Sequence, residues 1–204
     1  MIVFAIILAA GTSSRLGLNK LTVSIDGESV IRRSVKPFLM AELHKVLVVT
    51  GHDHRIINKE LDGLDVSLIR NPHYKEGMST SVRAAMPFLE GTDALLFHLG
   101  DKPFVTSRSI KLVLHTYREC KAKIVMPRFD GKTGHPVMIN ASLLRDEIGM
   151  IHGDSGLREV IEKYKRDVVF IEGDSGNLCD IDTSWVDISY LFIFLYPDFA
   201  DQPS

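Results

Sequence analysis

Small residues, hydroxyl groups and two cations are concentrated in one short segment near the N-terminus. The segment, residues 8–20, reads LAAGTSSRLGLNK and continues an unbroken apolar run. Small residues such as Gly11 let backbone N–H groups approach an anion closely, and the hydroxyls of Thr12 and Ser13 are further donors. Arg15 and Lys20 would add positive charge. The combination predicts a phosphate-binding loop, and the alternative is an ordinary strand-to-helix turn with solvent-facing cations.

The spacing of the glycines in this segment disfavours two familiar nucleotide-binding loops. It lacks the G-x-G-x-x-G pattern of dinucleotide-binding folds and the Gly-Lys-Ser/Thr ending of P-loops. A Rossmann-type oxidoreductase and a P-loop NTPase are therefore disfavoured, and a phosphate-binding loop of another kind is expected.

The composition is that of a compact globular chain. It has 204 residues, 45% of them hydrophobic, a formal net charge of -2 and two cysteines. A chain of this length buries enough apolar surface to fold as one domain, and the apolar content excludes disorder. The charge gives no case for a nucleic-acid partner. The few cysteines predict no disulfide framework and a reducing, cytoplasmic setting.

Two apolar runs, residues 2–10 and 191–196, need to be compared with membrane spans. Both are shorter than the about 20 residues that a helix needs to cross a bilayer, and the first has no basic segment in front of it. The first is expected to be a strand, and the second to pack on the core or against a partner. No membrane partner is predicted.

The period of the apolar residues switches repeatedly along the chain, which is the main indication of fold class. Continuous apolar runs predict buried strands, and stripes at helical spacing predict the helices between them. Strands are expected at residues 2–8, 46–49, 66–69, 94–98 and 124–126. Helices are expected at residues 29–39, 56–61 and 107–119, and from Ser79 or Thr80 to Leu89, with one of these two residues as the N-cap.

Strands that alternate with helices form βαβ units and a mainly parallel sheet. The stretch from Gly134 to Ile139 predicts a short strand without a clear helix before it, so the sheet is expected to become mixed there. We therefore expect one α/β domain with three layers, α/β/α, over residues 1–190. An unassigned tail follows at residues 191–204.

Several segments together resemble a known family. The loop matches the pattern L-A-A-G-x-S-x-R-x-G-x-x-K, and the others follow in the family's order: residues 71–72 and 77–83, 100–105, 134–137, 153–158 and 180–183. They resemble the MobA-like NTP transferases, and most closely the molybdenum cofactor cytidylyltransferases among them, from residue 2 to about residue 187. The resemblance implies the nucleotide-diphospho-sugar transferase fold, which is glycosyltransferase-A-like and Rossmann-like.

The resemblance also implies roles for individual residues. Arg15, Lys20 and Asp101 are the implied catalytic residues, and the two cations hold the triphosphate and offset charge on the leaving pyrophosphate. Ala10 stands where guanylyl enzymes of the family carry a second glycine, which favours cytidylyl transfer. The implied nucleotide-binding residues are Leu8, Ala9, Ala10, Gly11, Thr12, Ser13, Asn71, Gly77, Ser79, Thr80 and Ser81. For residues 77–81, a well-capped helix start is the alternative.

Two aspartates are the implied metal ligands. Asp101 matches the family's magnesium-binding aspartate, and Asp182 is the implied second ligand. The chemistry agrees, because ligands of open α/β sheets bind at the carboxyl ends of the strands, and Mg²⁺ there can neutralise phosphate charge. The alternatives are a turn before Pro103 for Asp101 and a helix cap for Asp182.

The implied acceptor-binding residues are His135, Asp154 and Arg158. A structural role before Pro136 is the alternative for the histidine, and an ion pair between positions i and i+4 is the alternative for the other two. The chain departs from the family at Lys102, where an uncharged residue is usual. We expect this cation to lie beside the metal and to alter phosphate or acceptor preference.

These features predict a Mg²⁺-dependent nucleotidyltransferase. Its substrates would be CTP, or another NTP, and the terminal phosphate of a molybdopterin-type cofactor, with a recipient molybdoenzyme as a further partner. The alternatives are a nucleotidyltransferase for a sugar phosphate or other alcohol phosphate, and a non-catalytic nucleotide- or cofactor-binding partner of a molybdoenzyme.

Overall fold

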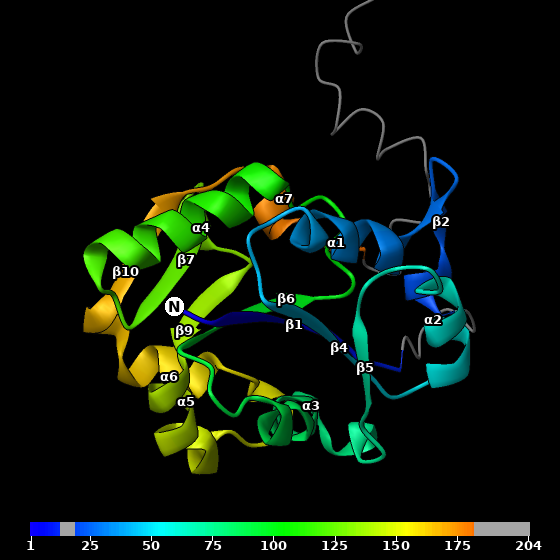
Figure 1. The fold of residues 1–204 in the computed structure, drawn as a ribbon, viewed down its shortest axis with the longest axis horizontal. Helices are drawn as coiled ribbons and strands as arrows, with labels where there is room; N and C mark the ends of the chain where they lie inside the picture. The colour runs from blue at the N-terminus through cyan, green and yellow to red at the C-terminus, as the bar shows by residue number, and fades with distance from the viewer. Residues whose placement is uncertain (13–18, 182–204) are drawn as a thin grey trace, which may run out of the picture.

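An eight-stranded sheet forms the centre of the computed structural model, which describes residues 1–12 and 19–181 (Figure 1). Its strands are β1 (Val3–Ala9), β4 (Lys45–Thr50), β5 (Ser67–Arg70), β6 (Ala94–Leu99), β7 (Ile124–Phe129), β8 (Lys132–Thr133), β9 (Val137–Asn140) and β10 (Val168–Glu172). A separate hairpin contains β2 (Ser24–Ile25) and β3 (Glu28–Ser29). The strands expected from the apolar runs are all present.

The strand order is β10-β7-β9-β6-β1-β4-β5, with β8 paired to β7. The neighbours β6, β1, β4 and β5 run parallel, whereas β9 is antiparallel to both β6 and β7. The prediction that the sheet becomes mixed between Gly134 and Ile139 is therefore confirmed, although β9 begins only at Val137.

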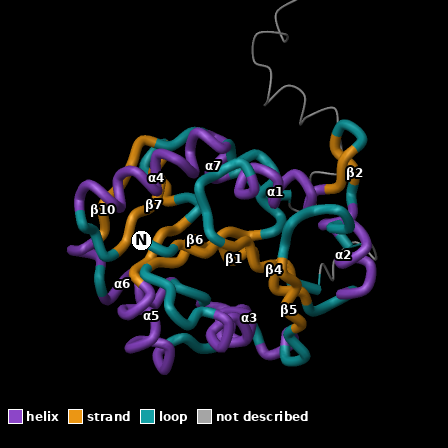
Figure 2. The backbone as a smooth tube through the Cα atoms, in the orientation of Figure 1, coloured by secondary structure: helices purple, strands orange, loops and turns teal. Residues whose placement is uncertain are grey.

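Helices cover both faces of the sheet, which confirms the three-layer α/β/α prediction (Figure 2). The hydrophobic core on one face includes residues of the first, second and fourth helices, and the core on the other includes residues of the third, fifth and sixth. The helices are α1 (Val30–Leu39), α2 (His54–Glu60), α3 (Met78–Ala85), α4 (Ser107–Cys120), α5 (Ala141–Glu147), α6 (Arg158–Lys163) and α7 (Ser175–Leu178).

The residues of β1 explain why its apolar run is unbroken. Val3, Ala5 and Ile7 pack into the core beneath α1 and α4, whereas Phe4 and Ile6 pack into the core beneath α3. Successive side chains of a strand point to opposite faces, so a central strand between two helical layers needs apolar residues at every position.

The boundaries of one helix, α3, differ from the prediction at both ends. As expected, α1 follows Ser29 and α4 spans Ser107–Cys120. In contrast, α3 begins at Met78 after Gly77, so neither Ser79 nor Thr80 is its N-cap. The α-helix also ends at Ala85, before the predicted end at Leu89, and a 3-10 turn that contains Pro87 follows it. Pro87 has no N–H to donate to the Arg83 carbonyl four residues earlier, so the α-helical hydrogen-bond pattern stops before it.

No helix within residues 1–12 and 19–181 is long and apolar enough to cross a membrane. The expected domain boundary near residue 190 and the tail at residues 191–204 lie outside the described residues.

Candidate active site

The sheet topology brings four chain segments to one edge. The strands β6, β1, β4 and β5 are adjacent and parallel, so their carboxyl ends lie side by side. Gly11 follows β1, Asp101 follows β6 and Asn71 follows β5. Residues predicted from three separate motifs therefore meet at the edge where ligands of open α/β sheets bind.

Lys20 and Asp101 form the charged centre of this edge. The Lys20 Nζ donates a hydrogen bond to the Asp101 Oδ2 at 2.5 Å. The lysine side chain is 23% exposed and the aspartate side chain is 19% exposed, so both can still be reached from solvent. The structure thus brings together a cation suited to phosphate and a carboxylate suited to a metal.

Close packing fixes the turn that carries Asp101. The Gly100 N–H donates to the Leu8 carbonyl at 2.9 Å, and the Ser34 hydroxyl donates to the Gly100 carbonyl at 2.8 Å. A Cβ on Gly100 would lie 2.9 Å from the Ile31 Cδ1 and 3.1 Å from the Ala9 Cβ. Glycine is therefore required here by space, and the tight fit holds Asp101 against the end of β1.

Asn19 positions Lys20, a role that the sequence interpretation missed. Its Oδ1 accepts a hydrogen bond from the Leu21 N–H at 3.1 Å, and its Nδ2 donates to the Asp53 Oδ2 at 3.3 Å. The residue is only 8% exposed. It caps the 3-10 turn Lys20–Thr22 and ties this turn to the segment after β4. Asparagine directly before a short helical turn is the sequence signal that identifies such a cap.

Asn71 organises the loop between β5 and α3. Its Nδ2 donates to the Thr80 hydroxyl at 2.9 Å and to the Ser81 hydroxyl at 3.0 Å, and its Oδ1 accepts from the His73 N–H at 2.9 Å. Asn71, Ser79 and Ser81 are 2%, 1% and 3% exposed. The side chains of these three residues thus belong to the framework, and the nucleotide contacts predicted for them would have to come from their backbone groups.

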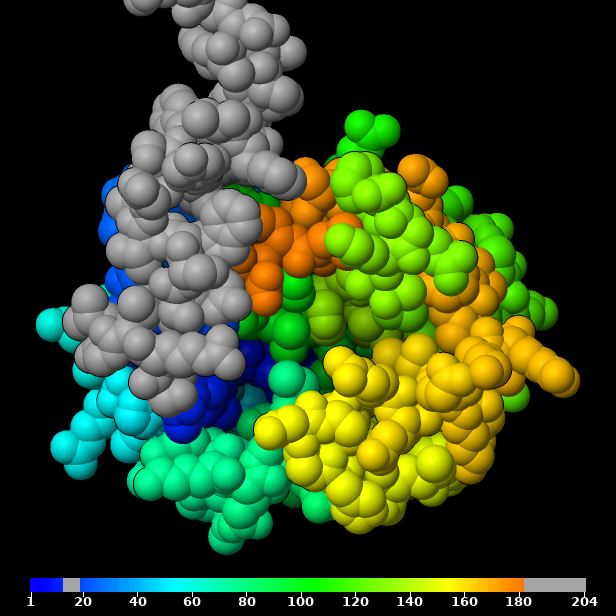
Figure 3. Space-filling view, turned by 180° about the vertical axis from the view of Figure 1, so that it is seen from behind, coloured from blue at the N-terminus to red at the C-terminus, as the bar shows by residue number. Residues whose placement is uncertain are grey.

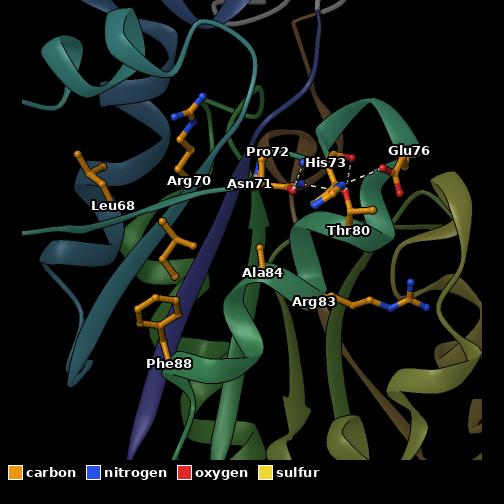
Figure 4. Close-up of a pocket in the computed structure, with 11 residues that line it drawn as sticks. Leu68, Arg70, Asn71, Pro72, His73, Glu76, Thr80, Arg83, Ala84 and Phe88 are labelled. Carbon is orange, nitrogen blue, oxygen red and sulfur yellow. Dashed lines mark hydrogen bonds and ion pairs between the residues drawn. The ribbon is translucent and has the colours of Figure 1, made fainter.

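A groove of about 620 Å³ lies behind this loop, lined by residues of β5 and α3 (Figure 4). Asn71 and Thr80 line it, and Figure 4 shows the hydrogen bond between their side chains. Neither Lys20 nor Asp101 is among its lining residues. The groove is therefore separate from the charged pair.

Gly77 forms a close contact with the predicted acceptor segment. Its φ is 105°, and a Cβ there would lie 2.4 Å from the Gly153 carbonyl carbon. Figure 3 shows the segments around these two glycines, blue-green and yellow, side by side. The Asp154 Oδ1 accepts a hydrogen bond from the Met78 N–H at 3.2 Å, so it supplies the α3 cap that Ser79 and Thr80 were expected to provide.

Asp154 and Arg158 do not form the ion pair considered above. The Asp154 carboxylate contacts α3, and Arg158 is exposed at the first position of α6. That structural alternative is therefore wrong. Binding of the acceptor by these two residues stays a prediction.

His135 packs against a second histidine, His98 of β6. Their ring centroids lie 6.0 Å apart with an interplanar angle of 73°. Burial is the main cause that lowers the pKa of both rings, to about 4 for His135 and well below its ordinary value for His98. Both imidazoles are therefore neutral near neutral pH. The packing fits the structural alternative for His135, and its contact with an acceptor stays a prediction.

Asn177 of α7 holds the His135 segment in place and was not singled out from the sequence. Its Nδ2 donates to the His135 carbonyl at 2.7 Å and to the Ser109 hydroxyl at 2.7 Å. The His135 N–H in turn donates to the Asn177 carbonyl at 2.9 Å. Gly134 is required here, since a Cβ would lie 2.6 Å from that carbonyl oxygen.

Three predicted residues, Ser13, Arg15 and Asp182, lie outside the described residues. Within the described residues, no group of three or more His, Cys, Asp or Glu side chains is placed to hold a metal. Asp101 alone still suits Mg²⁺, because this ion is commonly bound through one or two carboxylates together with substrate phosphates and water.

Comparisons with known proteins identify the family of this chain. The MobA-like NTP transferase domain matches residues 5–168. The chain is 28% identical to the molybdenum cofactor cytidylyltransferase of Escherichia coli (strain K12) over 144 aligned residues. The aligned segment covers 70% of this chain and 72% of that protein.

Two solved structures have a similar fold. One is a nucleotidyl transferase from Methanothermobacter, with a TM-score of 0.78, 23% identity and coverage of 95% of this chain and 99% of that chain. The other is Rv0371C from Mycobacterium tuberculosis H37Rv in complex with manganese, with a TM-score of 0.73, 20% identity and coverage of 94% and 98%. The fold is that of the nucleotide-diphospho-sugar transferases. Because the matching domain spans more than half of the sequence, the chain belongs to the MobA-like NTP transferase family and is an enzyme of the nucleotidyltransferase class.

Proposed function

We propose that the enzyme transfers CMP from CTP to the terminal phosphate of a molybdopterin-type cofactor and releases pyrophosphate. The contact between Lys20 and Asp101 carries the proposal, since it joins a cation for the triphosphate to a carboxylate for a metal. Ala10 in the loop favours cytidylyl transfer, and the similarity to a molybdenum cofactor cytidylyltransferase supports the acceptor.

The reaction needs positioning and charge neutralisation more than covalent chemistry. An oxygen of the acceptor phosphate attacks the α-phosphorus in line, and the bond from that phosphorus to the bridging oxygen breaks, so that pyrophosphate leaves. Lys20 and Arg15 stabilise the charge of the leaving group, and backbone N–H groups after β1 hold the phosphates. Asp101 would hold Mg²⁺, with Asp182 as the second ligand, and this ion would neutralise phosphate charge when bound.

The setting we propose is the cytoplasm, with a molybdoenzyme as the recipient of the product. Cys120 and Cys179 are both free thiols, which is compatible with a reducing compartment. The manganese bound to a protein of similar fold supports the use of a divalent cation by this enzyme.

A pyrophosphate-release assay with each of the four NTPs, with and without molybdopterin, tests the function. We expect release with CTP, Mg²⁺ and molybdopterin, and its loss in Asp101→Asn. The exposed Asp65→Asn variant makes the same change away from the site and should keep full activity. Release that requires a sugar phosphate or another alcohol phosphate instead would identify the rival enzyme, and binding without release would identify a non-catalytic partner.

A further inference from the structure

The ammonium of Lys102 is bound inside the protein. Lys102 is 9% exposed, and its Nζ donates a hydrogen bond to the Leu178 carbonyl at 2.5 Å. Leu178 is the last residue of α7, and the last carbonyls of a helix have no partner within it. A lysine ammonium is a favourable partner for such a carbonyl. The sequence predicted a cation beside the metal site, and the structure shows this ammonium bound to the end of α7.

A second hydrogen bond joins the same two segments. The Ile181 N–H donates to the main-chain carbonyl of Asp101 at 2.8 Å. Residues 178–181 are thus bound to the Asp101–Lys102 turn twice, once through the Lys102 side chain and once through the Asp101 backbone. The next residue in the chain is Asp182, the predicted second metal ligand.

The backbone of Lys102 also forms a hydrogen bond with a buried histidine of β6. The Nε2 of His98, which is fully buried, donates to the Lys102 carbonyl at 3.0 Å. This histidine and His135 are both neutral, since burial and the nearby Lys102 charge lower their pKa values. The Lys102 ammonium is therefore the charged group of this buried cluster, and its partner is a carbonyl.

A direct phosphate contact would disrupt this arrangement. The ammonium would have to leave the Leu178 carbonyl, and this carbonyl at the end of α7 would lose its partner. The Lys102 ammonium contacts α7. Among the described residues, Lys20 is the cation that contacts the Asp101 carboxylate.

We propose that Lys102 is a positioning residue that fixes the Asp101 carboxylate relative to residues 178–181 and so organises the divalent metal site. The inference rests on the proposed role of Asp101 as a metal ligand. It gives the lysine a function that does not involve contact with the nucleotide.

The test uses Lys102→Met and Lys102→Gln in the full chain. The side chains of methionine and glutamine are both one atom shorter than that of lysine, and of the two only glutamine keeps an N–H donor. Mn²⁺ binding in the presence of CTP is titrated by electron paramagnetic resonance, CTP binding without metal is measured by calorimetry, and backbone hydrogen exchange is followed over residues 173–181. These readouts do not depend on turnover, so they still decide the inference if no acceptor is found and the proposed function fails.

For Lys102→Met we expect the Mn²⁺ Kd to rise about tenfold, which corresponds to the loss of one hydrogen bond to a charged group. Exchange in residues 173–181 should become faster, and the metal-free CTP Kd should stay within about twofold of the wild-type value. Lys102→Gln should lie between wild type and Lys102→Met. The exposed Lys111→Met variant removes the same charge from α4 and should match wild type.

Two results would overturn the inference. One is weaker metal-free CTP binding with an unchanged Mn²⁺ Kd, which would make Lys102 a phosphate ligand. The other is wild-type Mn²⁺ binding and hydrogen exchange in both variants. If Lys102→Met does not fold, Lys102→Gln alone decides between these outcomes by the same measurements.

Discussion

The ammonium of Lys20 lies 2.5 Å from the carboxylate of Asp101, although 81 positions separate the two residues in the sequence. The contact joins the loop after β1 to the turn after β6, two neighbouring strands of the sheet. Each side chain neutralises the other at the edge where substrate is expected to bind. Removal of either residue therefore leaves an unpaired charge as well as a missing ligand contact.

Lys20→Met should lower kcat/KM by about 100-fold to 1000-fold, the usual loss when one group that stabilises transition-state charge is removed. Pyrophosphate release under saturating metal measures the effect. Lys59→Met, an exposed lysine of α2, is the control for the change in charge and should keep wild-type activity. In the double variant with Asp101→Asn, the two losses should not add, because the side chains are in contact. Additive losses would show that the pair does not act as a unit.

Gly77→Ala should destabilise the protein and weaken nucleotide binding, because the new methyl group would meet the Gly153 backbone. The matched control is Gly91→Ala. Gly91 also has a positive φ, 74°, but a Cβ there meets nothing within 4 Å. Both variants place alanine at a positive φ. Only Gly77→Ala adds the collision, together with a ψ of 170° that is essentially confined to glycine. Urea denaturation compares them, and equal losses would contradict the steric argument.

Asp154→Ala should lower the free energy of unfolding by about 1 kcal/mol, because α3 loses the acceptor of its Met78 N–H. Asp154→Asn keeps an oxygen acceptor and should lose less. Chemical denaturation measures both. A higher KM for the acceptor with unchanged stability would instead assign the carboxylate to substrate binding.

Stability should fall as the pH falls, because the two histidines that are buried in the folded protein take up protons more readily in the unfolded chain. The unfolded chain binds protons near a pKa of about 6.5, whereas burial lowers the pKa of folded His135 to about 4 and that of His98 well below the ordinary value. Stability is therefore complete above about pH 6.5 and decreases as the pH falls toward the folded pKa. Each histidine contributes a slope of up to about 1.4 kcal/mol per pH unit.

Urea denaturation between about pH 7.5 and about pH 5 measures this slope before most carboxylates titrate. His135→Gln should reduce it. His115→Gln replaces an exposed histidine of α4 and should leave the slope unchanged. An unchanged slope in His135→Gln would show that His135 is not buried in its neutral form.

Much of the fold could be predicted from the sequence because its signals are local. The alternation of continuous apolar runs with helical stripes identified the strands and the layers, and the stretch from Gly134 to Ile139 identified the antiparallel strand. The start of α3 was mispredicted because its capping group comes from Asp154, 76 positions away. No local pattern around Ser79 or Thr80 contains that information.

The types of the site residues were likewise evident, and their partners were not. The sequence by itself determined that Lys20 follows a segment of small residues after a buried strand and that a carboxylate stands at the end of another strand, since both depend on residue type and on the nearest element. Only the tertiary structure decided that Lys20 contacts Asp101, that Asn71 is a buried framework residue, and that the Lys102 ammonium turns to α7. The physical reason is that a charge takes the partner that packing brings within hydrogen-bond distance, and strand order determines which segments become neighbours.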